Sequence, residues 1–208
     1  MFYFSKIRSV SKLAYPSACW NFSRHENAVY LTFDDGPNPI ITPWVLDLLA
    51  KHKMKATFFC LAKNVIEYPE IYRRIIREGH AVGNHSYDHP NGWQTKSKKY
   101  LANIELASKT IDSNLFRPPY GKMRLKQYQT LQKKYSIIMW DVLSGDFDQS
   151  INAEQCYENC VEGIENGSII VFHDSEKAFD KLREFLPSFF DDIHQNFDFR
   201  VIKSPASY

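Results

Sequence analysis

The chain has 208 residues, a length that suits one domain with a substantial hydrophobic core. Hydrophobic residues make up 44% and charged residues 24%, and this composition excludes a disordered or fibrous protein. The net charge is only +2, which gives no overall electrostatic reason to expect a nucleic acid or an acidic membrane surface as partner. We therefore expect residues 1–208 to form a single globular domain.

The first twenty residues, MFYFSKIRSVSKLAYPSACW, contain no long apolar stretch, because Lys6 and Arg8 interrupt it. A secretory signal needs about 7–15 consecutive apolar residues. Nor does any stretch reach the roughly 18 apolar residues of a membrane span. The sequence therefore predicts a cytoplasmic protein without a membrane span. Its four cysteines agree with a reducing compartment: Cys19, Cys60, Cys156 and Cys160. Cys156 and Cys160, four apart on a predicted helix, could touch one metal ion, but we expect packed thiols because no second Cys/His pair completes a site.

Apolar segments rich in β-branched and aromatic residues alternate with segments of helical pattern. The predicted strands cover residues 29–33, 56–60, 81–83, a short stretch before 117, 136–142, 168–172 and 199–202. The predicted helices cover residues 42–53, 69–79, 97–112, 125–134, 153–162 and 178–195. An alternation repeated about seven times predicts a parallel sheet with crossover helices, either an open doubly wound sheet or a closed or nearly closed barrel.

Four residues indicate where these helices begin, end or break. Thr42 is expected to cap the first helix, with Pro43 at its first position. Gly79 is expected to end the second helix. Pro187 is expected to kink or split the last one.

Polar side chains follow most of the predicted strands at the point where each strand ends. In parallel α/β proteins the chemistry gathers in the loops at these carboxyl ends. The residues concerned are, in strand order, Asp34 and Asp35, His85 and His89, Arg117 and Tyr120, Asp146, and His173. We take them as the candidate site.

Asp34 and Asp35 are adjacent carboxylates, which repel each other unless a cation or a donor compensates. One of them could bind a metal ion while the other faces a water molecule; the alternative is a solvated turn. His85 and His89, four residues apart, would project from one side of a helical turn, as in zinc sites, or form a coincidental pair. With one carboxylate they would make a three-ligand site with an open fourth position, as in catalytic zinc.

Arg117 precedes a stiff Pro-Pro-Tyr-Gly turn and could hold a carboxylate through a bidentate hydrogen bond, or serve structure alone. His173 ends an apolar strand and is either a general acid or a satisfied buried histidine. A general acid needs a carboxylate to tune it, and we favour Asp146 over Asp174. The other histidines are interpreted as ordinary polar residues: His25, His52, His80 and His194.

Five segments in order resemble the motifs of the polysaccharide deacetylase family, also called carbohydrate esterase family 4. They are TFDDGP at 32–37, HSYDH at 85–89, RPPYG at 117–121, DVLSGDF at 141–147 and IIVFHD at 169–174. The motifs span residues 32–174 and leave residues 1–28 as an N-terminal extension. The resemblance implies a distorted (β/α) barrel with about seven strand–helix units.

The resemblance also implies a role for each matching residue. Asp35, His85 and His89 would hold one divalent metal, usually zinc, with cobalt or nickel as alternatives. Asp34 would be the general base, and Arg117 would orient it.

The remaining implied roles concern the leaving group and the oxyanion. His173 would be the general acid, and Asp146 would tune it. The backbone amide of Tyr120 would help to stabilise the oxyanion.

The fourth motif departs from the family pattern. An aspartate usual in the family is replaced by Leu143, and the usual Asp-Trp pair is Asp146-Phe147. Phe147 keeps an aromatic face but lacks the indole N–H, which affects substrate fit rather than catalysis. Trp93 could supply a sugar-stacking surface instead, or simply anchor its loop. Together with Tyr120, these two aromatic residues are the candidates for substrate binding.

The function implied is that of a metal-dependent hydrolase that removes N-acetyl groups from an oligo- or polysaccharide of chitooligosaccharide or peptidoglycan type and releases acetate. Two alternatives are hydrolysis of another carbon–nitrogen bond in a small cytosolic substrate and non-catalytic carbohydrate binding. The expected partner is an N-acetylated carbohydrate, with no protein partner. Nucleic acid is not expected, because Lys96, Lys98 and Lys99 are typical of a solvated face.

Overall fold

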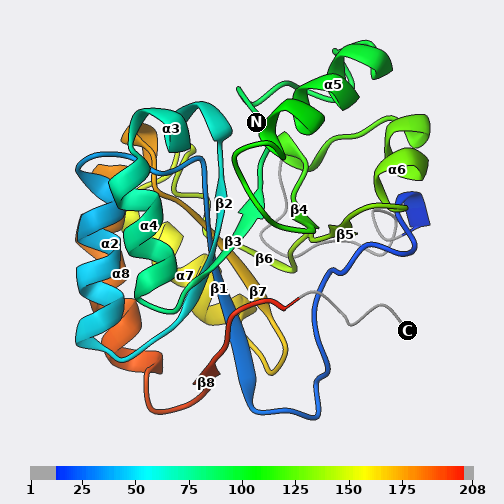
Figure 1. Ribbon diagram of the computed structural model, residues 1–208. Coiled ribbons are helices and arrows are strands. Elements are labelled where there is room, and N and C mark those ends of the chain that lie inside the picture. The colour runs from blue at the N-terminus through cyan, green and yellow to red at the C-terminus, as the bar shows by residue number, and fades with distance from the viewer. Residues whose placement is uncertain (1–12, 204–208) are drawn as a thin grey trace.

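A curled parallel sheet dominates the computed structural model, which describes residues 13–203 (Figure 1). Its seven main strands follow the order β5-β4-β3-β2-β1-β7-β6, and all their pairings are parallel. An eighth strand, β8, pairs with the start of β1. The strands are β1 (Ala28–Asp34), β2 (Ala56–Cys60), β3 (Ala81–Asn84), β4 (Leu115–Phe116), β5 (Ser136–Ile137), β6 (Val142–Leu143), β7 (Ile169–His173) and β8 (Asp198–Phe199).

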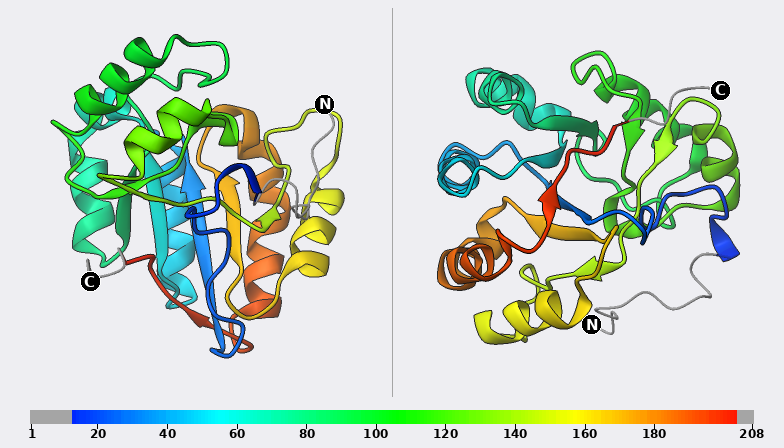
Figure 2. Two further views of the ribbon diagram at one scale, coloured as in Figure 1. Left: turned by 90° about the vertical axis from the view of Figure 1, so that its right-hand side faces the viewer. Right: turned by 90° about the horizontal axis from the view of Figure 1, so that it is seen from below.

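Helices cover the outer side of this sheet, as the view from below in Figure 2 shows. They are α2 (Ile41–Lys51), α3 (Ala62–Glu67), α4 (Pro69–Arg77), α5 (Ser97–Ala107), α6 (Leu125–Leu131), α7 (Ala153–Gly163) and α8 (Glu176–Ile193). A short 3₁₀ turn, η1, covers Pro119–Gly121. The predicted distorted barrel is therefore confirmed, as a half-barrel of strands with helices around it.

The predicted strand at 136–142 is wrong in one respect, because the run forms two strands at opposite ends of the sheet order. β5 pairs with β4, and β6 pairs with β7. Between them the backbone bonds elsewhere: Met139 N donates to the carbonyl of Cys19 at 2.7 Å, and the Ile138 and Met139 carbonyls accept from Arg117. These bonds replace the strand pairing that would join β5 and β6 into one continuous strand.

The predicted cap at Thr42 is also wrong. Helix α2 begins at Ile41, and Asn38 Oδ1 accepts from the N–H groups of Ile40 and Ile41 at 2.9 and 3.0 Å. The Thr42 hydroxyl instead donates to the Asp174 carboxylate.

The other helices agree with the prediction in position but differ at their ends. The helix at 69 ends before Gly79, which has the left-handed φ of 80° expected there. Helices α5 and α6 end earlier than predicted, α8 runs through Pro187 as one helix, and α3 was not predicted.

Cys156 and Cys160 are buried thiols, as predicted, and Cys60 is buried as well. Of the predicted N-terminal extension, residues 1–12 lie outside the described residues, whereas Tyr15 and Trp20 are buried in a cluster with residues of α5 and α6. Within residues 13–203, no helix has the length and apolar character needed to cross a bilayer.

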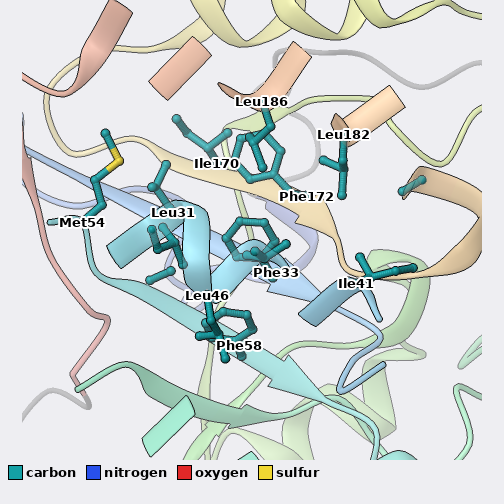
Figure 3. Close-up of a cluster of buried hydrophobic side chains, with 14 of the residues drawn as sticks. Leu31, Phe33, Ile41, Leu46, Met54, Phe58, Ile170, Phe172, Leu182 and Leu186 are labelled. Carbon is teal, nitrogen blue, oxygen red and sulfur yellow. The ribbon is translucent and has the colours of Figure 1, made fainter. Parts of the chain in front are cut away.

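The largest core cluster lies between the sheet and helices α2 and α8, and Figure 3 shows its centre. Because side chains alternate along a strand, Leu31 and Phe33 face these helices, while Thr32 and Asp34 face the other side and contact Arg117. The Phe33 ring stacks between those of Phe58 and Phe172, at centroid distances of 5.2 and 5.3 Å. Strand β1 thus anchors the core on one face and the candidate site on the other.

We predict that Phe33→Ala lowers the free energy of unfolding by about 3–5 kcal/mol, because it leaves a cavity between two rings. Phe33 is fully buried. Urea unfolding measures this loss, with Phe33→Leu as the control that keeps more of the volume and should cost clearly less. Equal losses for both variants would contradict a packing origin.

Candidate metal and catalytic site

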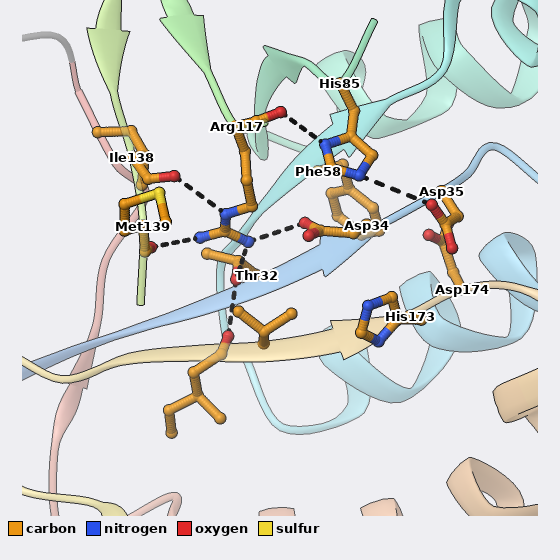
Figure 4. A network of polar contacts seen from close by, with 12 residues as sticks. Thr32, Asp34, Asp35, Phe58, His85, Arg117, Ile138, Met139, His173 and Asp174 are labelled. Atoms are coloured by element: carbon orange, nitrogen blue, oxygen red, sulfur yellow. Dashed lines mark hydrogen bonds and ion pairs between the residues drawn. The ribbon is translucent and has the colours of Figure 1, made fainter. Parts of the chain in front are cut away.

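Two of the predicted residues meet at the carboxyl ends of the central strands β1 and β7. In the parallel register, Asp34 is the partner of His173. Paired residues of neighbouring strands project from the same face of a sheet, so the two side chains lie side by side (Figure 4). Asp34 is only 3% exposed. The strand pairing alone therefore brings the predicted base next to the predicted acid.

Arg117 is fully buried and connects the site to the sheet. Its Nη1 donates to Asp34 Oδ1 at 2.8 Å and to Thr32 Oγ1 at 2.7 Å. Nε and Nη2 donate to the carbonyl oxygens of Ile138 and Met139 at 3.3 and 3.0 Å (Figure 4). The predicted bidentate bond to a carboxylate is wrong, because the guanidinium divides its donors between one carboxylate oxygen, one hydroxyl and the main chain.

Asp35, His85 and His89 offer ligand atoms that all lie within 4.8 Å of one another. Asp35 Oδ1 is 3.3 Å from His89 Nε2 and 3.7 Å from His85 Nε2. The same oxygen is buried without a hydrogen-bond partner, which is costly unless a cation compensates. One carboxylate and two imidazoles suit zinc and leave a coordination position open. These residues therefore fit a divalent metal ion.

His85 has the tautomer that a metal ligand needs. Its Nδ1 lies 2.8 Å from the carbonyl oxygen of Arg117, which can only accept, so Nδ1 carries the proton. Burial, followed by the neighbouring His89, lowers the pKa of His85 to about 3. The neutral ring therefore presents the lone pair of Nε2 toward Asp35.

The loop between the two histidines is a bend and not the predicted helical turn. Ser86 and His89 adopt left-handed backbone conformations, with φ of 78° and 65°. Ser86 Oγ accepts from the N–H of His89 at 3.0 Å, and the N–H of Ser86 donates to Asn84 Oδ1 at 2.7 Å. Side chain to backbone bonds thus fix a strained loop that aims His85 and His89 at one point.

His173 forms a tight pair with Asp146, as predicted. Asp146 Oδ1 lies 2.7 Å from His173 Nδ1, and Oδ2 accepts the backbone N–H of His173, also at 2.7 Å. Burial by itself lowers the pKa of His173, but the charge and hydrogen bond of the fully buried Asp146 outweigh it and raise the pKa to about 9. The imidazolium form is therefore stabilised near neutral pH.

The loop that carries Asp146 is held by two helices. Lys181 Nζ, from α8, donates to the carbonyl of Asp146 at 3.1 Å and to that of Asp148. Asn159 Nδ2, from α7, donates to the carbonyl of Ser144 at 2.9 Å. Lys181 was not predicted as a site residue, because a lysine on an amphipathic helix carries no local signal of such a contact.

Asp174, the less favoured partner for His173, faces the turn after β1. Its Oδ1 accepts the N–H of Gly36 at 3.0 Å, and its Oδ2 accepts from Thr42. A Cβ at Gly36 would lie 2.0 Å from Asp174 Oδ2, so only glycine fits there. Burial raises the pKa of Asp174 to about 8. This carboxyl group supports the turn that presents Asp34 and Asp35.

The three predicted aromatic residues occupy different places. The Tyr120 ring lies 4.5 Å from the ring of His89, and the Phe147 ring lies 5.0 Å from that of His173. Both therefore border the site. Trp93 is bound to an adjoining loop, where its Nε1 donates to the carbonyl of Met123 at 3.0 Å.

Comparisons with known proteins identify the family of this chain. The family model for polysaccharide deacetylases matches residues 23–137. A peptidoglycan-N-acetylglucosamine deacetylase of Bacillus cereus is 33% identical over 171 residues, which are 76% of this chain and 62% of that protein. A chitooligosaccharide deacetylase of Azorhizobium caulinodans is 32% identical over 160 residues, 73% of this chain and 76% of that protein.

The fold is similar as well. The structure of the peptidoglycan deacetylase PdaC from Bacillus subtilis superimposes with a TM-score of 0.73 at 30% identity, and the match covers 86% of this chain and 89% of that chain. The chain thus spans less than two thirds of the B. cereus relative but most of the B. subtilis structure. From its sequence, its fold and the matched segment, the chain belongs to the polysaccharide deacetylase family.

Proposed function

We propose that the protein removes N-acetyl groups from the amino sugars of an oligo- or polysaccharide, of chitooligosaccharide or peptidoglycan type, and releases acetate. One observation carries the proposal: Asp34 and His173 are register partners beside a three-residue cluster that fits a divalent metal. Hydrolysis of an amide needs a base for the attacking water, stabilisation of the oxyanion and an acid for the leaving nitrogen. The site has a candidate for each.

In this proposal Asp35, His85 and His89 hold the metal ion. When bound there, the ion supplies Lewis-acid polarisation of the acetamide carbonyl. We infer that it is zinc, because a set of two imidazoles and one carboxylate is typical of catalytic zinc sites. Cobalt and nickel accept the same donors.

Asp34 would accept the proton of the attacking water. Its carboxylate has a fixed direction, because Arg117 binds Oδ1 and is itself held by the main chain. The backbone N–H of Tyr120 would donate to the developing oxyanion. Support comes from the backbone of η1, in which Tyr120 has a left-handed φ of 60° and its ring contacts that of His89.

His173 would protonate the leaving nitrogen, since an amide anion is a poor leaving group. Nδ1 of His173 is bound by Asp146, so Nε2 is the nitrogen that can donate to the substrate. A free amine and acetate result. The Phe147 ring beside His173 would form part of the wall around the leaving sugar.

We predict that Asp34→Asn lowers kcat/KM by about 10²–10⁴-fold while the protein keeps its metal, because the change removes the base but no ligand. His85→Ala is the matched variant and should lose the metal. Acetate release and elemental analysis of the purified proteins measure the two effects. If Asp34→Asn loses metal as completely as His85→Ala, the roles of the two adjacent aspartates are exchanged.

The acid is expected to set the alkaline limb of the pH profile. Activity should fall as the pH rises through the pKa of His173, which then loses the proton it must give. Asp146→Asn removes the charge that raises this pKa, so the limb should move to lower pH by about one to two units. The pH dependence of kcat/KM, measured for the wild-type protein and Asp146→Asn, gives the shift. An alkaline limb at the same pH in both proteins would mean that a group other than His173 sets it.

The substrate dependence of His173→Ala separates protonation from binding. An acetamide should lose about 10²–10⁴-fold in kcat/KM, because its nitrogen needs the proton. An activated acetate ester, whose leaving group departs without a proton, should lose far less. Parallel assays of a chitooligosaccharide and an aryl acetate make the comparison. Equal losses would mean that His173 positions the substrate.

A further inference from the structure

Trp93 is both exposed and rigidly held. Its side chain is 57% exposed, although burial of a tryptophan is favourable. Yet its Nε1 donates to the carbonyl of Met123, and its own carbonyl accepts from Arg124 Nε and Nη2 at 3.1 and 2.7 Å. The backbone N–H of Trp93 donates to Asn91 Oδ1 at 3.0 Å. The indole is thus fixed at the surface, with its polar edge already occupied.

The loop beneath Trp93 is fixed by a fully buried side chain. Gln127 Nε2 donates to the carbonyls of Gly92 and Thr95 at 3.0 and 3.2 Å, and its Oε1 accepts the N–H of Arg124 at 2.7 Å. A Cβ at Gly92 would lie 2.2 Å from the carbonyl oxygen of Lys122, so the two loops are in direct contact. A rigid exposed aromatic face loses little conformational freedom on binding a ligand.

The loop that carries Trp93 and the loop that it contacts are rich in positive charge. Lys122 Nζ lies 5.1 Å from the centroid of the Trp93 ring, and Lys122 has no ion pair among residues 13–203. The two segments that meet here, 89–104 and 117–134, contain no Asp or Glu. Their exposed cations include Lys96, Lys98, Lys99, Arg124 and Lys126. In a chain of net charge +2 this is a local concentration of positive charge that attracts anions.

The patch adjoins the candidate catalytic site. Trp93 follows the metal-ligand candidate His89 by four residues, and Lys122 follows Tyr120 by two. The Tyr120 ring contacts the ring of His89, so the two loops leave the site side by side.

We propose that Trp93 and Lys122 form a subsite for a sugar next to the reacting one, and that Lys122 selects a glycan carrying a carboxylate there. Sugar rings present C–H faces that pack on an indole, and an ammonium group beside that indole pairs with an acidic substituent. This inference rests on the proposed function and extends it to substrate length and charge. It favours an acidic, muramic-acid-containing glycan over neutral chitin.

Equilibrium binding to metal-loaded protein with Asp34→Asn tests the subsite without turnover. The probes are chitotetraose and a peptide-free tetrasaccharide of alternating N-acetylglucosamine and N-acetylmuramic acid. We expect tighter binding of the acidic probe, a preference that weakens as salt is added. Lys122→Gln should cost the acidic probe about fivefold and the neutral probe almost nothing, since one partly screened ion pair is lost. Trp93→Ala should weaken both tetrasaccharides.

Lys51→Gln, which removes an exposed lysine on α2, is the control for net charge and should change neither affinity. Equal affinities for the two probes, or equal losses in Lys122→Gln, would overturn the subsite. The subsite would also be overturned if a thymidine oligonucleotide bound more tightly than the acidic tetrasaccharide and lost this affinity in Lys122→Gln. Failure of the proposed function is a different result: wild-type protein would release no acetate from either glycan, whatever the binding.

Discussion

The buried contact between Arg117 and Asp34 is the interaction on which the rest of the site depends. A fully buried guanidinium needs an acid and several acceptors, because an unpaired charge in the interior is very costly. Asp34 provides the charge, Thr32 a hydroxyl, and the main chain of residues 138–139 the rest. The Phe59 ring covers one face, with its centroid 4.1 Å from Cζ. Removal of either side chain would leave the other group unpaired in the core, whereas the isosteric Asp34→Asn change keeps an oxygen acceptor for Arg117 Nη1.

This contact also explains why the adjacent Asp34 and Asp35 side chains face different partners. Asp34 is the last residue of β1, so the sheet register fixes it beside His173 and against Arg117. Asp35 has already left the strand with a left-handed φ of 83°, which a non-glycine residue adopts at a cost of about 1 kcal/mol. Asn64 Nδ2 holds its carbonyl at 2.7 Å. The strained turn points the second carboxylate at the histidines instead of at the arginine.

The sequence predicted those features that depend on local pattern. Alternating apolar segments located the central strands, and polar residues at their carboxyl ends located Arg117 and His173, which lie beside Asp34. Features that depend on distant partners were not predictable. The division of residues 136–142 follows from bonds to Cys19 and Arg117, and the Thr42 hydroxyl serves Asp174 from another strand end. Lys181 was missed because its contact lies in a loop more than thirty residues away.

The supports of the site are mostly carbonyl groups of the main chain. Arg117 binds the carbonyls of Ile138 and Met139, His85 binds the carbonyl of Arg117, and Lys181 binds those of Asp146 and Asp148. A point mutation exchanges a side chain and leaves such an acceptor in place. Apolar residues of other shapes at 138 and 139 can therefore replace one another without removing a support. The geometry of the site therefore tolerates substitution at the positions that supply only a main-chain carbonyl group. The sensitive positions are those whose side chains donate the hydrogen bonds, namely Arg117, His85 and Lys181.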